Sequence, residues 1–100
     1  DGHGMVMSIR DIGKLKWNDA KAACDELILN GYNDWHLPSK EECVLIVKNP
    51  SIFKLGIQRD YYWSSTVSYN YDAWAFSLER YDLERKQKDY SQFVRAVRTY

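Results

Sequence analysis

The side chains that most often carry reactions or bind metals are few in this chain of 100 residues, which has two histidines and two cysteines. His3 and His36 are isolated from one another and lack the paired Cys or His spacing of a zinc site. The Ser64-Ser65-Thr66 hydroxyls could supply a nucleophile, but neither a Gly-x-Ser-x-Gly turn nor a histidine at a defined spacing accompanies them. The sequence therefore predicts no catalytic constellation, no metal site and no cofactor.

The strongest candidate for ligand binding is Tyr69-Asn70-Tyr71-Asp72, where two tyrosines lie in a polar segment between two β-prone stretches. Both rings are hard to bury in such a loop, and exposed rings can stack flat on a sugar or on a protein surface. The amide and the carboxylate can exchange hydrogen bonds with the same ligand. We therefore predict that Tyr69, Asn70, Tyr71 and Asp72 contact a glycan or a protein; the alternative is that the tyrosines are incidental surface residues.

A second candidate is a basic surface for sulfated or other anionic glycans. Six cations could gather on neighbouring strands: Arg80, Arg85, Lys86, Lys88, Arg95 and Arg98. Acidic residues alternate with them along the chain: Glu79, Asp82, Glu84 and Asp89. This interleaving favours a solvated hairpin with offset charges over a binding surface. We keep Arg80, Arg85, Lys86 and Lys88 as a secondary candidate site.

The overall charge excludes some classes of partner. Fourteen basic and fourteen acidic side chains cancel, so no overall field attracts the chain to nucleic acid or to an anionic membrane. No apolar run approaches the roughly 18–20 residues of a membrane span, and no stretch has the pattern of a signal peptide. We expect one domain that neither binds nucleic acid nor inserts into a membrane, and the composition leaves its oligomeric state open.

The elements that must position these residues meet at the corner formed by residues 31–42. Gly31 is expected just past a helix C-terminus, because glycine reaches positive φ without a Cβ clash. Pro38 keeps the preceding residue out of the helical region. Ser39 and Glu42 have the spacing of a capping box. The corner therefore predicts a helix on each side of a fixed turn.

Apolar periodicity predicts one helix over Trp17–Leu29 and a second over Lys40–Lys48 that Asn49-Pro50 ends. Strands are expected over residues 5–12, 61–66, 73–78 and 93–99, with turns at 11–14 and 81–83. The last strand is apolar on both faces and should be central in the sheet. This order predicts an α+β fold with two helices grouped on one side of a twisted, mainly antiparallel sheet.

The core is expected to be aromatic. The side chains assigned to it are Trp17, Trp35, Trp63, Trp74 and Phe76. Cys24 and Cys43 are most simply two buried thiols, because free cysteine is among the most buried residue types. A single disulfide between them is the alternative.

Four segments match a known pattern in order and in spacing. They are Trp17-Asn18-Asp19-Ala20-Lys21-Ala22-Ala23-Cys24, Asn33-Asp34-Trp35-His36-Leu37-Pro38-Ser39-Lys40-Glu41-Glu42, Tyr62-Trp63-Ser64-Ser65-Thr66 and Phe93-Val94-Arg95-Ala96-Val97-Arg98. Over nearly its whole length the chain resembles the Lcl C-terminal domain family, a bacterial domain of unknown function named after a collagen-like surface adhesin. The resemblance implies a C-type-lectin-like fold, distantly similar to the formylglycine-generating enzymes. It also implies an extracellular setting: a secreted, periplasmic or cell-surface bacterial protein, often an adhesin.

Three residues depart from the family's pattern. His36 stands where Arg is usual, and His donates only in the right tautomer or protonation state. Ala96 stands where relatives often have a cysteine, the natural partner of a cysteine such as Cys24 in the first helix. Cys43 stands where an apolar residue is usual. These departures weaken the expectation of an oxidising compartment but leave the expected fold unchanged.

Two activities known for such folds find no support in the residues. Trp17-Asn18-Asp19 has the order of the calcium-binding triplet of sugar-binding C-type lectins, but it opens a helix, and no second loop completes the roughly six to eight oxygen ligands that calcium needs. A formylglycine-generating oxidase needs a late cysteine pair, and no cysteine follows Cys43. We expect a non-enzymatic binding module, with a structural or assembly domain that binds no external ligand as the alternative.

Overall fold

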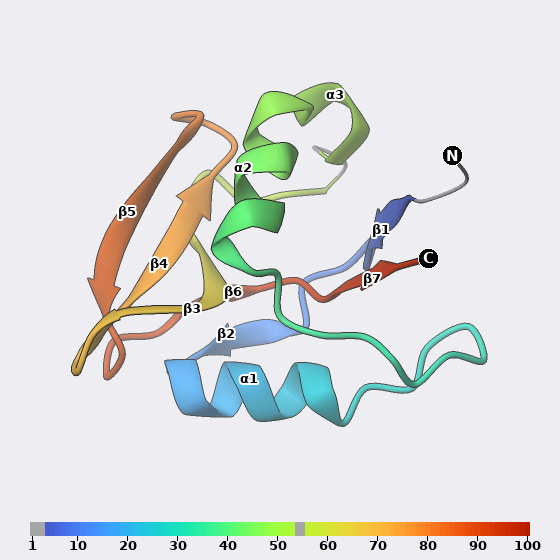
Figure 1. Ribbon diagram of the computed structural model, residues 1–100, viewed down its shortest axis with the longest axis horizontal. Coiled ribbons are helices and arrows are strands. Elements are labelled where there is room, and N and C mark those ends of the chain that lie inside the picture. The colour runs from blue at the N-terminus through green and yellow to red at the C-terminus, as the bar shows by residue number, and fades with distance from the viewer. Residues whose placement is uncertain (1–3, 54–55) are drawn as a thin grey trace.

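The computed structural model describes residues 4–53 and 56–100, which form an α+β fold (Figure 1). The elements in chain order are β1 (Met5–Met7), β2 (Gly13–Leu15), α1 (Trp17–Asp25), α2 (Lys40–Lys48), α3 (Pro50–Phe53), β3 (Tyr62–Tyr69), β4 (Asp72–Ser77), β5 (Asp82–Gln87), β6 (Gln92–Val94) and β7 (Val97–Thr99). Five strands form a sheet in the order β2-β6-β3-β4-β5, and β1 pairs with β7 separately. The described pairings are antiparallel except for a parallel contact between β3 and β6, so the sheet is mainly antiparallel, as predicted.

The helices cover both faces of the sheet, so the prediction that they are grouped on one side is wrong. Ala73 and Ala75 of β4 join a buried cluster with Trp17 of α1, whereas Phe76 joins a second cluster with Cys43 of α2. Successive side chains of a strand point to opposite faces, so α1 and α2 pack on opposite sides (Figure 1). The small alanine side chains allow α1 to pack closely against β4.

Three tryptophans are buried as predicted, and each indole N–H has a backbone acceptor. Trp17 donates to Ser64 O at 2.8 Å, Trp35 to Leu29 O at 3.1 Å and Trp63 to Leu15 O at 2.8 Å. Such bonds let an amphipathic ring be buried without an unpaired donor. The three side chains therefore fill the core and also hold the backbone of β3, of β2 and of the turn after α1.

The prediction that Trp74 is a core residue is wrong, because this residue is only partly buried. It lies on the face opposite to Ala73 and Ala75, and the Lys40 ammonium is 4.1 Å from its ring centre. Lys40 is the first residue of α2, so Trp74 packs beside the start of the helix rather than under its apolar face. Phe76, two residues further along the same face, is fully buried as predicted.

The second helix is confirmed with its predicted bounds, Lys40–Lys48. The Ser39 hydroxyl accepts from the Glu42 N–H at 3.2 Å, and the Glu42 carboxylate accepts from the Ser39 N–H at 2.8 Å, which completes the capping box. The Lys40 N–H donates to the Thr66 hydroxyl at 2.8 Å. That bond attaches the beginning of α2 to β3, so the local cap also sets the position of the helix on the sheet.

The first helix ends at Asp25, so its predicted extension to Leu29 is wrong, as is the placing of Gly31 at its C-terminus. Asn30 and Gly31 instead form a two-residue turn with φ of 55° and 80°, across which Leu29 and Tyr32 exchange backbone hydrogen bonds at 3.0 Å. Asn-Gly suits a tight turn in which both residues have positive φ. The positive φ predicted for Gly31 is confirmed, but it serves this turn.

Both terminal strands are interrupted, which corrects the single strands predicted for residues 5–12 and 93–99. The turn predicted at 11–14 is also wrong, since residues 13–15 form β2. β2 pairs with β6, β1 pairs with β7, and Arg95-Ala96 separates β6 from β7. Of the two halves of the predicted last strand, only β6 is central. The turn predicted at 81–83 ends instead at Tyr81, and residues 82 and 83 already belong to β5.

Both cysteines are free and buried, as the simpler of the two interpretations predicted. Cys24 belongs to the α1-side cluster and Cys43 to the α2-side cluster, so the sheet separates them. Across the described residues, no helix combines the length and apolar character needed to cross a membrane.

Candidate functional site

The predicted ligand-binding segment forms the tip of the β3–β4 hairpin. Tyr69 and Asp72 are paired strand residues, and Asn70-Tyr71 is the turn between them. Tyr69 and Tyr71 are 69% and 81% exposed, so both rings are free of the core. A two-residue turn holds them more rigidly than the open loop expected from the sequence.

Asn70 and Tyr71 line an open groove of about 600 Å³. The other lining residues come from the start of α1 and from the end of β5 with the turn after it: Asn18, Gln87, Lys88 and Asp89. The groove therefore presents amide groups, which both donate and accept hydrogen bonds, next to an exposed aromatic ring. One lysine and one aspartate add a charge of each sign.

Backbone hydrogen bonds hold the walls of the groove together. The Lys88 N–H donates to the Tyr71 carbonyl at 2.7 Å, and the Trp17 N–H donates to the Lys88 carbonyl at 3.1 Å. The Lys88 ammonium lies 4.5 Å from the centre of the Trp17 ring. Residue 88 thus joins the hairpin tip to the first residue of α1, and the groove is positioned by the fold rather than by mobile side chains.

The structure separates the four predicted ligand-binding residues. Asn70 and Tyr71 line the groove, whereas Tyr69 and Asp72 lie outside it. The Tyr69 ring is 5.9 Å from the Arg85 guanidinium. Arg85 of β5 pairs with Trp74 of β4, and both side chains lie on the α2 side of the sheet. Tyr69 and Tyr71 therefore present their rings to different sides of the hairpin.

The secondary basic residues do not share one surface. Arg85 and Lys86 are neighbours in β5, so their side chains point to opposite faces. The Lys86 ammonium lies 4.2 Å from the Tyr61 ring centre and 3.5 Å from the Glu84 carboxylate. Arg80 lies in the turn before β5, and Lys88 lies in the groove. The wider set is dispersed as well, because Arg95 is 2% exposed and Arg98 contacts the Asp34 carboxylate at 2.6 Å.

Residues 5–98 match the family model of the Lcl C-terminal domain. The chain belongs to this family. None of the curated proteins compared with the chain matches it. The match includes all four segments on which the resemblance rests, and it spans α1, the capped corner and the hairpin that carries the groove.

The side chain of His36, in the capped corner, lies against the carboxylate of Glu42. His36 Nε2 lies 3.1 Å from both oxygens of the Glu42 carboxylate, and its backbone pairs with Val97. Glu42 also caps α2, so the histidine is fastened to the helix cap. His3, the other histidine considered as a metal ligand, lies outside the described residues.

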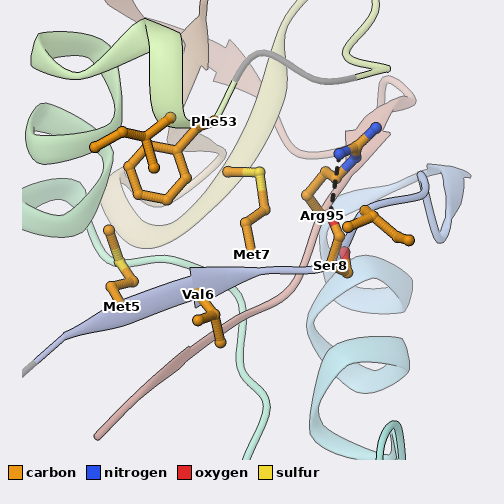
Figure 2. Close-up of a pocket in the computed structure, with 8 residues that line it drawn as sticks. Met5, Val6, Met7, Ser8, Phe53 and Arg95 are labelled. Carbon is orange, nitrogen blue, oxygen red and sulfur yellow. Dashed lines mark hydrogen bonds between the residues drawn. The ribbon is translucent and has the colours of Figure 1, made fainter.

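A second cavity of the domain, of about 230 Å³, lies beside β1 (Figure 2). Met5 and Met7 point toward Phe53 on one side of the strand, and Val6 points to the other side. The Arg95 guanidinium closes one end, where it donates to the Ser8 carbonyl at 2.9 Å. Its size and its mainly apolar wall are typical of imperfect packing between a strand and a short helix, so it is a weaker site candidate than the groove.

The thiols of this Lcl C-terminal domain are not poised for nucleophilic chemistry. Burial, with a smaller contribution from Asp25, raises the pKa of Cys24 to about 12. Burial also raises the pKa of Cys43 well above its ordinary value. Both thiols are therefore protonated at neutral pH, and the thiolate is the reactive form. Among the described residues, no group of three or more His, Cys, Asp or Glu side chains is arranged to hold a metal ion.

Sequence reasoning missed three residues of the groove: Asn18, Gln87 and Asp89, the last of which it treats only as an offsetting charge. Asn18 was considered only as part of a calcium triplet and as a helix N-terminal residue. Gln87 lies in a charged stretch, residues 79–89, that was not assigned a strand. A signal for Gln87 exists in the alternation of β5, because recognising that strand would have placed residue 87 opposite residue 72 at the hairpin tip.

Proposed function

We propose that this domain is a non-enzymatic binding module whose groove holds a glycan, or a protein segment of similar chemistry. The observation that carries the proposal is Tyr71, which is 81% exposed at the edge of a groove that is also lined by Asn18, Asn70 and Gln87. A flat ring can cover the apolar face of a sugar while the amides exchange hydrogen bonds with its hydroxyls. Asn18 and Asn70 supply such amides beside the Tyr71 ring.

A preformed groove favours recognition of a ligand by limiting the ordering cost of binding. The bond from the Lys88 N–H to the Tyr71 carbonyl and the bond from Trp17 to Lys88 fix the walls. Less conformational entropy is then lost when a ligand binds. The groove carries Lys88 and Asp89 together, so its local charge is balanced and its ligands are recognised mainly by stacking and hydrogen bonding.

The test is a glycan array, with neutral and sulfated sugars, probed with the wild-type domain, Tyr71→Ala and Tyr69→Ala. The second variant is a matched control, because it removes another exposed ring from the same hairpin, on the side away from the groove. We expect binding to be lost in Tyr71→Ala and kept in Tyr69→Ala. Loss only in Tyr69→Ala would move the site to the Arg85 side, and binding by neither variant nor wild type would count against a glycan ligand.

We further propose a C-type-lectin-like fold and an exported or surface-exposed parent protein. Support for the fold comes from the pairing of the first and last strands, β1 and β7, and from two helices that flank a mainly antiparallel sheet. Membership of a family named after a surface adhesin supports the setting. Superposition of an experimental structure on lectin domains tests the first statement, and cell fractionation with an antibody to the domain tests the second.

A structural or assembly role without external ligand is the second candidate. It is favoured by an apolar groove of about 460 Å³ between residues 7–12 and the segment around Leu27 and Leu29. Ile9, at its edge, is 70% exposed, and exposed apolar grooves often contact another protein surface. If this groove packs on another domain of the parent protein, Ile9→Ser should release that domain, whereas Tyr71→Ala should not.

A further inference from the structure

β5 is an edge strand whose outward backbone groups can be identified. Among the described strands it is bonded to β4 alone. The Lys88 N–H donates to Tyr71, its partner in the continued β4–β5 register. Residues of an antiparallel strand point their backbone groups to alternate sides. The backbone groups of residues 82, 84 and 86 therefore face β4, and those of Leu83, Arg85 and Gln87 face outward.

These outward groups are available to another strand. Within residues 4–53 and 56–100, the backbone N–H and C=O of Leu83 and Arg85 make no backbone hydrogen bond outside the β4–β5 ladder, and the Gln87 carbonyl accepts one bond, from the Tyr90 N–H at 3.2 Å. A carbonyl has a second lone pair for a further bond. The edge can therefore accept three residues of an added strand.

The side chains on one face of this edge have a self-complementary order of charge. Asp82 and Glu84 are followed at the same two-residue spacing by Lys86 and Lys88. Charged edge strands ordinarily resist pairing. Two copies of this order laid antiparallel, however, bring each acid opposite a base.

We propose that β5 pairs antiparallel with β5 of a second copy of this chain, about a two-fold axis that passes through Arg85. In this register Asp82 faces the partner's Lys88, and Glu84 faces the partner's Lys86. By symmetry the dimer contains four acid–base pairs on one face. Leu83 and the partner's Gln87 exchange backbone hydrogen bonds, as do the two copies of Arg85.

The outward groups and the charges together select this register. Backbone pairing requires that outward residues oppose outward residues, so the register can move only in steps of two. Shifting the register by two residues in one direction places Glu84 opposite the partner's Glu84. Shifting it by two residues in the other direction places Lys86 opposite the partner's Lys86. Like charges directly opposite one another destabilise a strand pair. The proposed register has one such contact, between the two Arg85 side chains on the other face.

The first experiment measures self-association of the whole chain by sedimentation over a range of concentrations, at low and at high salt. We expect a weak dimer that salt weakens further, because the charge pairs are exposed. Glu84→Lys should weaken the dimer by about tenfold or more, since two attractive contacts become repulsive. The double reversal, Glu84→Lys with Lys86→Glu, should restore it, because acid again faces base.

Two substitutions at residue 85 form a matched pair with opposite expectations. Arg85→Thr removes the like-charge contact on the axis and should tighten the dimer. Arg85→Pro removes an outward N–H that β4 does not use, so it should abolish pairing while the fold is kept; circular dichroism verifies the fold. Both substitutions at residue 85 keep the hydrogen bond from the Tyr61 hydroxyl to the Glu84 carboxylate. Glu84→Lys removes that bond.

Three outcomes overturn the proposal. They are a wild-type chain that stays monomeric at the highest concentration, a dimer that Arg85→Pro leaves unchanged, and a double reversal no better than Glu84→Lys. The proposal is independent of glycan binding, because none of these measurements involves a ligand. If these measurements overturn the dimer, the proposed binding site in the hairpin groove and its glycan-array test are unaffected.

Discussion

Arg95 donates from Nε to the Asp11 carboxylate across 2.8 Å, at the place where the chain passes between its two sheets. The Arg95 guanidinium also donates to the Ser8 and Gly56 carbonyls, each at 2.9 Å. Its side chain is 2% exposed and that of Asp11 is 18% exposed. Arg95, one of the six cations considered for a basic surface, is therefore an internal ion-pair residue that holds residues 8–11 against the connection between β6 and β7.

Removing the acid of this pair should destabilise the domain strongly. Asp11→Ala leaves the buried guanidinium without its counter-charge and also removes the acceptor of the Tyr62 hydroxyl, which lies 2.7 Å away. We expect a loss of about 3 kcal/mol in the free energy of unfolding, within the range for broken buried pairs. Urea denaturation measures it. Asp25→Ala, which breaks a half-exposed pair with Lys21, is the control and should cost about 0.5 kcal/mol or less; similar losses in both variants would contradict this view of Arg95.

The two tryptophans Trp35 and Trp74 should respond differently to truncation. Trp35 is 5% exposed, and its indole N–H is bonded to Leu29, so Trp35→Ala should cost about 3–5 kcal/mol of unfolding free energy. Trp74 is partly exposed and packs against Lys40, so Trp74→Ala should cost clearly less. Thermal or chemical denaturation compares them. A loss below about 1 kcal/mol for Trp35→Ala would show that it is not a core residue.

Alkaline pH should destabilise the domain through its buried thiols. Burial, assisted by Asp25, raises the pKa of Cys24 from 9.0 to about 12, so the unfolded chain loses this proton at lower pH than the folded one. The free energy of unfolding should change little below pH 9 on this account, and fall as the pH rises from about 9 to about 12.

Cys24→Ala isolates that contribution. The variant removes one titrating group, so its stability should fall less steeply over the same pH range, by about 1.4 kcal/mol per pH unit at most. The remaining slope comes from Cys43, Tyr61 and Tyr62, whose pKa values are also raised by burial. Equal slopes for wild type and variant, measured by urea denaturation at each pH, would contradict the assignment.

Local signals determined which elements could be predicted. α2 has its predicted bounds because its start and end depend on neighbours in sequence, the Ser39–Glu42 capping box and Asn49-Pro50. The end of α1 depends on a tight turn at Asn30-Gly31, which competes with the last helical turn. The breaks in the terminal strands depend on Arg95 and Asp11, which are 84 residues apart, and no window of sequence contains both.

The candidate site likewise has features that local sequence predicts and features that depend on long-range contacts. The exposure of Tyr69 and Tyr71 follows from a short polar segment between strands, and so it could be predicted from those residues alone. Their separation to different sides of the hairpin follows from the register of β3, β4 and β5. Asn18 enters the groove only because α1 packs on the alanine face of β4, and that packing requires long-range pairing that local patterns do not encode.

The pairing of β1 with β7 determines how the domain transmits mechanical load. Gly4 and Tyr100 exchange backbone hydrogen bonds of 2.8 and 3.0 Å, and β1 and β7 lie on the side of the molecule away from the β3–β4 hairpin (Figure 1). A pulling force between the ends acts across this strand pair, so its bonds open one after another rather than in concert. We therefore expect β1 and β7 to separate at low force, before the sheet that carries the hairpin groove unfolds.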